Sequence, residues 1–353
     1  MTEQTSAVRP AAAGPAGGAA AKLPPVTAIV PCYNAAATLE RAAASILDGA
    51  PDNLQLILVD DGSADATPAL CDKLAAGDRR VRAIHQKNGG ASAARNAGLD
   101  AAAGEWVLFV DADDALLPGL WDALPAAFAA DPQLILFGMA RQSGPAPCPL
   151  APGFYPTPAD LGDALRPLLF ESGYLAAPYP KLFRLPALRA AGLRFDEGLK
   201  INEDVLFNTV FLQNSISIFC LSGVYYYQYD GQTGSLSRRL RGDLLDAEAY
   251  TAPALEAMLR RWGYDPAPYL AESRLRAALN QYGLLTGCRG NMPFGQRRAL
   301  FARILADPAA RDALRSRLRQ DARPLLAVPY RIGVALNAPG WLAAYTLFKQ
   351  RFL

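Results

Sequence analysis

The sequence predicts an α/β fold, in which a mostly parallel sheet has helices on both faces and is followed by a helical C-terminal region. Between Val26 and Gly138, short apolar runs of β-type residues alternate with alanine-rich stretches of helical length. This alternation is typical of parallel strands joined by crossover helices. Beyond about Leu240 the spacing of apolar residues is helical almost to the end of the chain.

The first half of the chain supplies strand and helix candidates in alternation. Apolar and β-branched residues run together at Val26–Val30, Gln55–Val59, Val81–His85, Trp106–Val110 and Leu134–Gly138. Helical spacing occupies Thr38–Leu47, Ala66–Ala76, Ala91–Ala103 and Gly119–Ala130. Thr38 is expected to cap the first helix, Pro118 to introduce the last, and Gly104 to follow the end of the third.

A proline-rich stretch, residues 145–158, separates this half from a mixed region. There the pattern predicts a helix at Asn202–Gln213, a strand at Ile216–Leu221 and an aromatic run from Tyr225 to Tyr227. The N-terminal tail should be disordered, because its Ala, Gly and Pro side chains bury too little surface to offset the entropy of ordering. We therefore divide the chain into a tail, a two-part α/β domain and a helical region, at residues 1–23, 24–140 with 141–235, and 236–353.

Composition excludes several classes of function. The 353 residues carry a formal charge of only +2, which gives no case for binding to nucleic acid. Five scattered cysteines argue against a disulfide framework or a zinc site, and no apolar stretch reads as a membrane span, so we expect a cytoplasmic protein. His85 is the single histidine. It leaves no basis for multi-histidine metal sites, and we expect backbone groups to satisfy its ring at the end of a strand.

Polar residues follow the predicted parallel strands, whose carboxyl ends meet at one edge of a sheet and form its usual ligand site. The most acidic loop holds Asp111, Asp113 and Asp114. Three carboxylates this close repel one another unless a cation neutralises them, and such oxygen ligands suit Mg²⁺ or Mn²⁺. The alternative is that these acids cap the helix that follows Pro118.

Three other features lie on the same predicted edge. Asp60 and Asp61 end the second strand, where a carboxylate could accept hydrogen bonds from a ring such as uracil, and Tyr33 offers a face for stacking. Asn88 opens a loop of little bulk before a helix that contains Arg95. In isolation, the acidic pair would equally suit a tight turn that caps the next helix.

Four segments together resemble, in order and spacing, the nucleotide-sugar domain of the family 2 glycosyltransferases, which have the Rossmann-like GT-A fold. They are residues 26–34, 58–63, 88–98 and 111–114. The resemblance is strong over residues 25–140 and weaker over 175–235. Its later motifs are similar to residues 181–184 and 201–207, although Pro180 stands where similar sequences have asparagine.

The resemblance implies a role for each matching residue. The nucleobase would be held by Pro31, Tyr33 and Asp61, with support from Asp60, and the rest of the nucleotide-sugar site would comprise Asn88, Arg95, Asp111 and Ala112. A divalent cation would bind to Asp113, Asp111 and Asp114. Asp204 would be the general base, with Glu203 and Lys181 near the acceptor; without the resemblance, Glu203 and Asp204 would be favourable charges at a helix N-terminus.

The function implied is metal-assisted transfer of one sugar, with inversion, from a nucleoside diphosphate sugar to a glycan or lipid-linked glycan. UDP-sugars are the expected donors and surface polysaccharide assembly the expected context. Met258 replaces the glutamine of the Gln-x-x-Arg-Trp motif of processive synthases, so we expect one sugar per event. The alternatives are nucleotidyl transfer, which would need a glycine-rich basic loop near the N-terminus, and an inactive protein that only binds nucleotide-sugars.

The basic surplus lies at the C-terminal end. Residues 289–353 carry a net charge of +9, which leaves −7 for residues 1–288. Basic helices are followed there by the apolar segment Pro324–Leu353, which contains aromatic residues. Our hypothesis is that this region docks on the inner membrane, where a lipid-linked acceptor would lie. The alternative is a helical subdomain with a solvated arginine face, packed on the catalytic domain.

Overall fold

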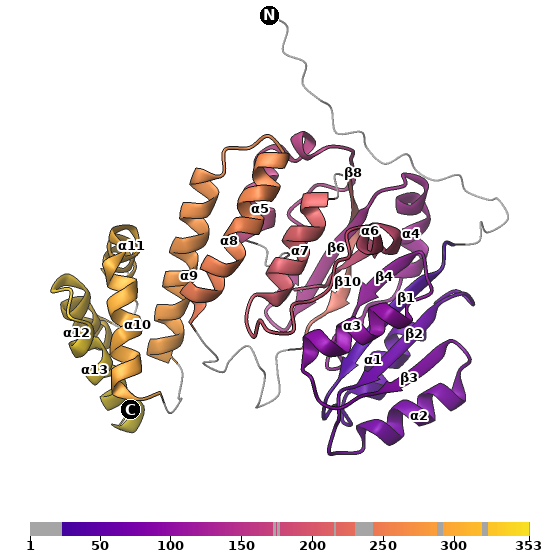
Figure 1. Ribbon diagram of the computed structural model, residues 1–353, viewed down its shortest axis with the longest axis horizontal. Coiled ribbons are helices and arrows are strands. Elements are labelled where there is room, and N and C mark those ends of the chain that lie inside the picture. The colour runs from indigo at the N-terminus through magenta and orange to yellow at the C-terminus, as the bar shows by residue number, and fades with distance from the viewer. Residues whose placement is uncertain are drawn as a thin grey trace, which may run out of the picture. The chain divides into compact units, whose positions relative to one another are not determined.

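The computed structural model describes residues 23–171, 174, 177–214, 217–229, 243–287, 292–319 and 324–352. The chain divides into two compact units, one formed by residues 1–231 with 257–264 and the other by 232–256 with 265–353. In Figure 1 the first unit contains the sheet, and the described residues of the second unit are mainly helical. Residues 1–22 of the predicted tail and the predicted boundary at 235/236 lie outside the described residues.

The predicted alternation of strands and helices is confirmed in the first unit. The elements in order are β1 (Val26–Cys32), α1 (Leu39–Leu47), β2 (Gln55–Asp60), α2 (Thr67–Gly77), β3 (Val81–His85), α3 (Ala91–Ala101) and β4 (Trp106–Phe109). These four strands pair in parallel in the order β3-β2-β1-β4. Since such crossovers are right-handed, α1 and α2 cover one face and α3 the other. Figure 1 shows α3 against β1 and β2.

The rest of the first unit extends this sheet with strands of both directions. It contains β5 (Ala115–Leu116), α4 (Leu120–Ala129), β6 (Leu134–Arg141), β7 (Gly144–Ala146), β8 (Gly153–Tyr155), the 3-10 helix η1 (Pro158–Ala164), α5 (Leu165–Phe170), β9 (Lys181–Arg184), α6 (Leu185–Ala190), α7 (Glu203–Asn214) and β10 (Ile218–Tyr227). β9 lies between β4 and β6 and runs antiparallel to both. β6 and β10 are parallel, so the α/β class is confirmed with antiparallel strands added in this part.

Close packing explains several local features of the sheet. Gly98 of α3 lies against β1, where an added Cβ would come within 2.3 Å of Ile29. Gly104 was expected just beyond the end of α3, but that helix ends at Ala101 and Ala102 is extended. Gly104 is required for another reason, because a Cβ there would lie 2.7 Å from the backbone nitrogen of Thr27.

The expected helix starts are close but differ in detail. Thr38 occupies the N-cap position of α1, yet its hydroxyl donates to the carbonyl of Ala35 and caps no amide of the helix. α4 begins at Leu120 behind Gly119, whose φ of +91° lies in the left-handed region, so Pro118 precedes the N-cap. The predicted strand and aromatic run near residue 220 form a single strand, β10.

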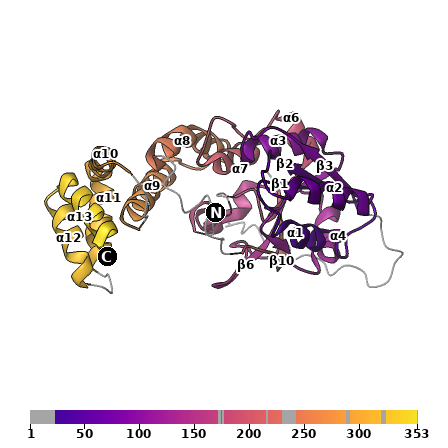
Figure 2. The ribbon, with the colours of Figure 1, turned by 90° about the horizontal axis from the view of Figure 1, so that it is seen from below.

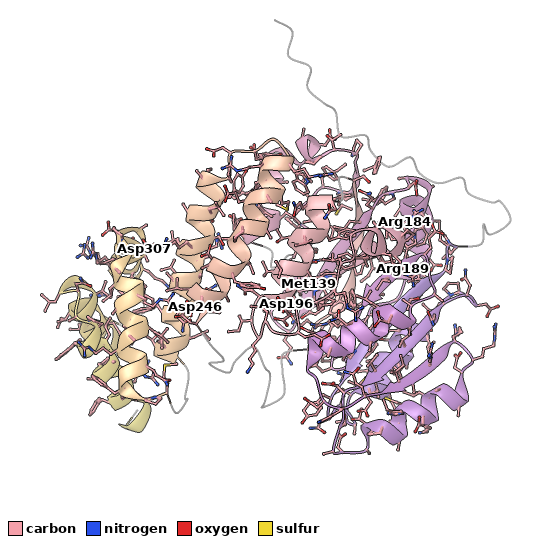
Figure 3. The ribbon with its side chains drawn as sticks, viewed as in Figure 1. Met139, Arg184, Arg189, Asp196, Asp246 and Asp307 are labelled. Atoms are coloured by element: carbon pink, nitrogen blue, oxygen red, sulfur yellow. The ribbon has the colours of Figure 1, made fainter. Side chains whose placement is uncertain are left out.

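Two arginines tie the middle of the chain to the sheet. Arg184 of β9 pairs with Glu105 at 2.9 Å, and Arg189 of α6 donates to the carbonyl oxygen of Ala102 at 2.7 Å. Both are labelled in Figure 3. They attach β9 and α6 to the loop that leads into β4.

The second unit is helical, as predicted for the region beyond residue 240. Its helices are α8 (Leu244–Arg261), whose last turn belongs to the first unit, α9 (Ala267–Gly287), α10 (Phe294–Ala306), α11 (Pro308–Arg319), α12 (Pro324–Ala335) and α13 (Pro339–Phe352). Figure 2 shows α10 to α13 gathered into one bundle. Arg297 is buried and donates to the carbonyl of Leu285, so not every arginine here is solvated. None of the helices that the structure describes is both long and apolar enough to cross a membrane.

Candidate active site

The carboxyl ends of β1, β2 and β4 meet at one edge of the sheet, which carries the predicted site. Tyr33, just beyond β1, is 56% exposed, whereas Asp60 and Asp61 at the end of β2 are buried. Asp111 follows β4 and is partly buried. The register pairs Cys32 with Asp60 and Ile29 with Phe109, which brings the loops after these strands together.

Three carboxylates form a cluster in the loop after β4. One oxygen from each of Asp111, Asp113 and Asp114 lies within 4.8 Å of the others. Desolvation by nearby protein atoms and the charge of Asp111 raise the pKa of Asp113. A set of carboxylate oxygens that repel one another suits a hard cation such as Mg²⁺ or Mn²⁺, so the donor chemistry fits the predicted metal.

Asp114 differs from Asp111 and Asp113 because it is buried, and two groups of the β10 segment hold its carboxylate. Oδ2 accepts a hydrogen bond from the hydroxyl of Tyr226 at 2.6 Å, and Oδ1 accepts one from the backbone N–H of Tyr229 at 3.0 Å. Burial, followed by the charge of Asp111, raises the pKa of Asp114 to about 8. The alternative that Asp114 caps α4 is wrong, since it holds the end of β10 instead.

Tyr226 is a site residue that sequence reasoning missed. Its side chain is fully buried, its ring stacks on that of Tyr179 at 4.4 Å, and the backbone N–H of Asp111 donates to its hydroxyl oxygen at 3.2 Å. Tyr226 therefore braces both ends of the acidic loop. The aromatic run in the sequence was its only signal.

Arg95 connects the acidic loop to the start of α7. This arginine of α3 is buried at 5% exposure. One guanidinium nitrogen donates to Asp204 at 3.0 Å, the other to Asp111 at 3.3 Å, and Glu203 lies 3.9 Å away. The guanidinium also lies 5.3 Å from the centre of the Phe195 ring. Arg95 was predicted to bind the nucleotide-sugar. Its guanidinium contacts both Asp111, predicted to bind the donor, and Asp204, the predicted general base.

Asp204 lies in the first turn of α7 and is largely buried. Burial raises its pKa to about 7, the charge of Arg95 acts in the opposite direction, and Glu203 and Asp111 add to the rise. A carboxylate whose pKa lies near neutral pH is well matched to general-base work. The environment of Asp204 therefore has the electrostatics that its predicted role needs.

Asn96 fixes the turn that precedes α7, and it too was missed. Its side chain accepts from the N–H of Phe195 at 2.8 Å and donates to the carbonyl of Phe195 at 2.9 Å and to Glu197 at 2.8 Å. The ring of Phe195 stacks on Phe207 of α7 at 3.9 Å. Asp196, labelled in Figure 3, lies in this turn. Neighbouring residues of α3 thus hold both the turn and the acid that follows it.

Asp61 organises the loop before α3. Its carboxylate accepts hydrogen bonds from the backbone N–H groups of Gly89 and Gly90 at 2.8 and 2.7 Å, and from the side chain of Gln86 at 2.8 Å. Asn88 donates to its carbonyl oxygen at 3.0 Å. Oδ2 of Asp61 accepts only the bond from Gly90 among these, so it retains a lone pair for a ligand.

Asp60 is linked to the single histidine. Its carboxylate accepts from the N–H of Ser63 at 3.1 Å and lies 3.2 Å from Nδ1 of His85, while Nε2 of His85 lies 3.0 Å from Asp72. These two carboxylates, Asp72 first, raise the pKa of His85. The expectation that backbone groups satisfy His85 was wrong, because the sequence did not show that α2 brings Asp72 beside it.

Lys181 lies on β9 and is 1% exposed. Its ammonium group donates to the carbonyls of Tyr174 and Ala177 and to the side chain of Asn208 on α7. Burial lowers its pKa to about 7. These bonds anchor the segment before β9, and contact of Lys181 with an acceptor stays a prediction.

Arg41 of α1 is a further group at the edge of the site that the sequence did not indicate. It donates to the carbonyl oxygen of Asp113 at 2.6 Å, and its guanidinium lies 3.8 Å from the centre of the Tyr229 ring. Arg41 thus places positive charge beside the most exposed carboxylate of the cluster.

Known proteins share both the sequence pattern and the fold. The profile of Glycosyl transferase family 2 matches residues 27–180. The succinoglycan biosynthesis protein ExoO of Rhizobium meliloti is 35% identical over 257 residues, which cover 69% of this chain and 70% of ExoO. The uncharacterized glycosyltransferase EpsJ of Bacillus subtilis is 28% identical over 321 residues, covering 84% and 83% of the two chains.

Among solved structures, residues 1–349 of S. aureus TarS in complex with UDP-GlcNAc superpose with a TM-score of 0.59. The match is 20% identical and covers 93% of this chain and 92% of that one. It supports the GT-A assignment of the sheet and its helices. The profile match, the extent of the likeness to ExoO and the fold together show that the chain belongs to the family 2 glycosyltransferases.

Proposed function

We propose that this protein transfers one sugar per event from a nucleoside diphosphate sugar, with UDP-sugars preferred, to a hydroxyl group of a glycan or lipid-linked glycan acceptor. The bridge formed by Arg95 carries this proposal, because it joins Asp111 of the donor loop to Asp204 at the start of α7. ExoO is a succinoglycan biosynthesis protein, which supports a context in polysaccharide assembly. TarS binds UDP-GlcNAc, which supports a UDP-sugar as the donor. We place the reaction in the cytoplasm.

Asp204 acts as the base of a single displacement. It takes the proton from the acceptor hydroxyl, the oxygen attacks C1 of the donor sugar, and the nucleoside diphosphate leaves from the opposite side, which inverts the anomeric centre. A pKa of about 7 keeps much of the carboxylate ionised at neutral pH. General-base assistance of this kind is typically worth about 10²–10⁴-fold in rate.

Arg95 orients that base. Its guanidinium holds one oxygen of Asp204 and leaves the other for the acceptor, and its positive charge opposes the effect of burial on the pKa. Asn96 keeps the preceding turn in place, so the position of Asp204 depends on two adjacent residues of α3.

The donor lies on the edge formed by β1, β2 and β4. Tyr33 stacks on the nucleobase beside Pro31, and the free lone pair of Asp61 accepts a base N–H. Asp60 supports this loop through Ser63. The remaining contacts come from Asn88, Arg95, Asp111 and Ala112.

Asp111 and Asp113 would hold the divalent cation, Mn²⁺ or Mg²⁺, with Asp114 close enough to join them. Bound there, the cation supplies positive charge that stabilises the leaving diphosphate. Tyr226 keeps the loop in shape, since its hydroxyl contacts the loop at both Asp111 and Asp114.

One experiment tests the proposal: UDP-, GDP- and dTDP-sugars are incubated with the protein and nucleotide release is measured with Mn²⁺, Mg²⁺ or EDTA. We expect release from a UDP-sugar, abolished by EDTA and by Asp113→Ala, and lowered at least about 100-fold in Asp204→Asn while nucleotide binding is kept. Full activity of Asp204→Asn would remove the base assignment. Pyrophosphate release from a nucleoside triphosphate would favour nucleotidyl transfer, and binding without release an inactive protein.

A further inference from the structure

The hairpin of α12 and α13 exposes large apolar side chains on its outer side. We call Val328, Ile332, Leu336, Trp341 and Phe348 the outer apolar face; they are 41%, 42%, 72%, 50% and 53% exposed. The first three are spaced by four residues and follow one stripe that runs along α12 to Leu336, just beyond its end, and the last two are seven apart and share one stripe of α13. These stripes are regular rather than scattered, which distinguishes them from the isolated apolar residues common on protein surfaces.

The opposite stripes of the same helices make the core of the second unit. Tyr330 and Val334 of α12 and Leu342 and Ala343 of α13 are buried in one cluster with residues of α9, α10 and α11. A helix needs only one apolar stripe to pack onto such a core. The outer apolar face is therefore a second apolar surface that the fold of this unit does not require.

Trp341 joins the two stripes into one surface. Its indole N–H donates to the carbonyl of Pro329 on α12 at 2.8 Å, and a Cβ added to Gly333 would lie 3.0 Å from the indole ring. Pro329 and Gly333 lie one turn apart beside Ile332 and Leu336. The indole thus crosses from α13 onto α12 while half of it stays exposed.

Cations border this surface, and the hairpin itself contains no acidic residue. Arg331, next to Ile332, donates to the carbonyl of Leu318 at 2.7 Å. Lys349, next to Phe348, lies 5.7 Å from the centre of the Tyr330 ring. Arg315 of α11 reaches the carbonyl of Ala335 at 3.4 Å. Arg331 and Lys349 thus directly adjoin residues of the outer apolar face in the sequence, and Arg315, which also pairs with Asp312 at 3.1 Å, reaches the end of α12.

We propose that the outer apolar face docks the protein on the surface of an anionic membrane. Apolar and indole groups on one side of a helical hairpin enter the boundary between headgroups and acyl chains, and bordering Lys and Arg side chains meet anionic headgroups. A second protein molecule of the same sequence would carry the same positive charges, which oppose self-association through this face. Docking is a property of the second unit and does not depend on the proposed transfer chemistry.

The test is flotation of the full-length protein with phosphatidylcholine vesicles, with or without phosphatidylglycerol. We expect recovery with the phosphatidylglycerol vesicles only, reduced by high salt, which screens the charges. Ile332→Ser with Leu336→Ser should lower the partition coefficient about tenfold or more, because two apolar side chains no longer enter the lipid. Arg331→Gln with Lys349→Gln should lower it about tenfold, because each bordering charge contributes near the surface.

The matched control is Tyr250→Ser on α8, which removes a side chain that is 57% exposed outside the hairpin and should leave recovery unchanged. Nucleotide release by the same variants, measured without vesicles, separates a docking defect from a catalytic one. Absence of wild-type protein from the phosphatidylglycerol fraction, or equal recovery of the Ile332→Ser/Leu336→Ser variant, would overturn the proposal. A wild-type dimer that this variant converts to a monomer would also overturn it, since a second copy would then cover the face.

Discussion

Replacing Arg95 by methionine should move the pH dependence of the reaction to higher pH. The guanidinium lies 3.0 Å from one oxygen of Asp204 and opposes the rise that burial causes in the pKa of that carboxyl, which is about 7. Methionine has a similar length and no charge. Without the positive charge the ionised form of Asp204 loses its nearest partner, so its pKa must rise further.

The size of the shift follows from the geometry. Two unit charges about 4 Å apart interact by roughly 4 kcal/mol at an effective dielectric constant near 20. Since one pKa unit corresponds to about 1.4 kcal/mol, the limit is a rise of roughly 3 units. Entry of water into the space left by the guanidinium reduces this, as does the remaining charge of Lys181. We therefore expect a rise of about 1 to 2 units.

The assay is kcat/KM for nucleotide release as a function of pH, at saturating divalent cation because Arg95 also contacts Asp111. A base must be ionised to work, so the rate rises with pH through the pKa of Asp204 and the acid limb moves upward in Arg95→Met. Arg95→Lys keeps a positive charge and should stay close to the wild type. A folded, active Arg95→Met enzyme with the wild-type acid limb would refute the assigned base or its coupling to Arg95.

Three further predictions concern stability. The folded-state pKa of Asp204 is raised from 3.8 to about 7, so its contribution is fully present below about pH 4 and is lost as pH rises through 7. Between pH 5 and pH 8, the free energy of urea unfolding should fall less in Asp204→Asn than in the wild type, by up to about 3 kcal/mol; equal losses would contradict this. Asp114→Asn has one acceptor oxygen in place of two, so one of the two donors, the Tyr226 hydroxyl or the N–H of Tyr229, loses its acceptor, and the unfolding free energy should fall by about 1 kcal/mol; Asp114→Leu removes both acceptors and should lower it by about 2 kcal/mol or more. Asn96→Ala removes three hydrogen bonds from a buried turn and should cost about 3 kcal/mol in thermal or urea unfolding, with a fall in kcat; an unchanged midpoint would show that the turn does not need them.

Local order in the first half could be predicted from the sequence, because each strand there is a short apolar run and each helix has its own apolar spacing. The predicted strand at 55–59 and the observed β2 differ by one residue. The edge of the sheet that carries the site followed from parallel pairing alone. Predictions that depended on one residue type at one position failed more often. Gly104, for example, does not end α3, because its close contact with Thr27 is what requires a glycine there.

The contacts inside the site could not be predicted in the same way. Arg95 and Asp204 are 109 residues apart, and nothing in their types or spacing shows that they meet. Lys181 is buried, because its ammonium group donates to two carbonyls of the segment just before β9 and to Asn208 of α7, an arrangement that its residue type does not show. The motifs therefore indicated candidate residues, while the partner of each one depended on the fold.

The position of β9 limits how this enzyme can be divided. The strand comes from residues 181–184 yet lies between β4 and β6, which precede it in the chain. A fragment that ended at residue 180 would lack β9 and β10, so β4, β5, β6 and β8 would each lose a strand partner, and the open edges promote aggregation. It would also lack Tyr226 and the segment that holds Asp114. The half proposed to bind the donor is therefore not a portable module, and exchange of acceptor specificity between relatives should succeed only with breakpoints beyond Tyr227.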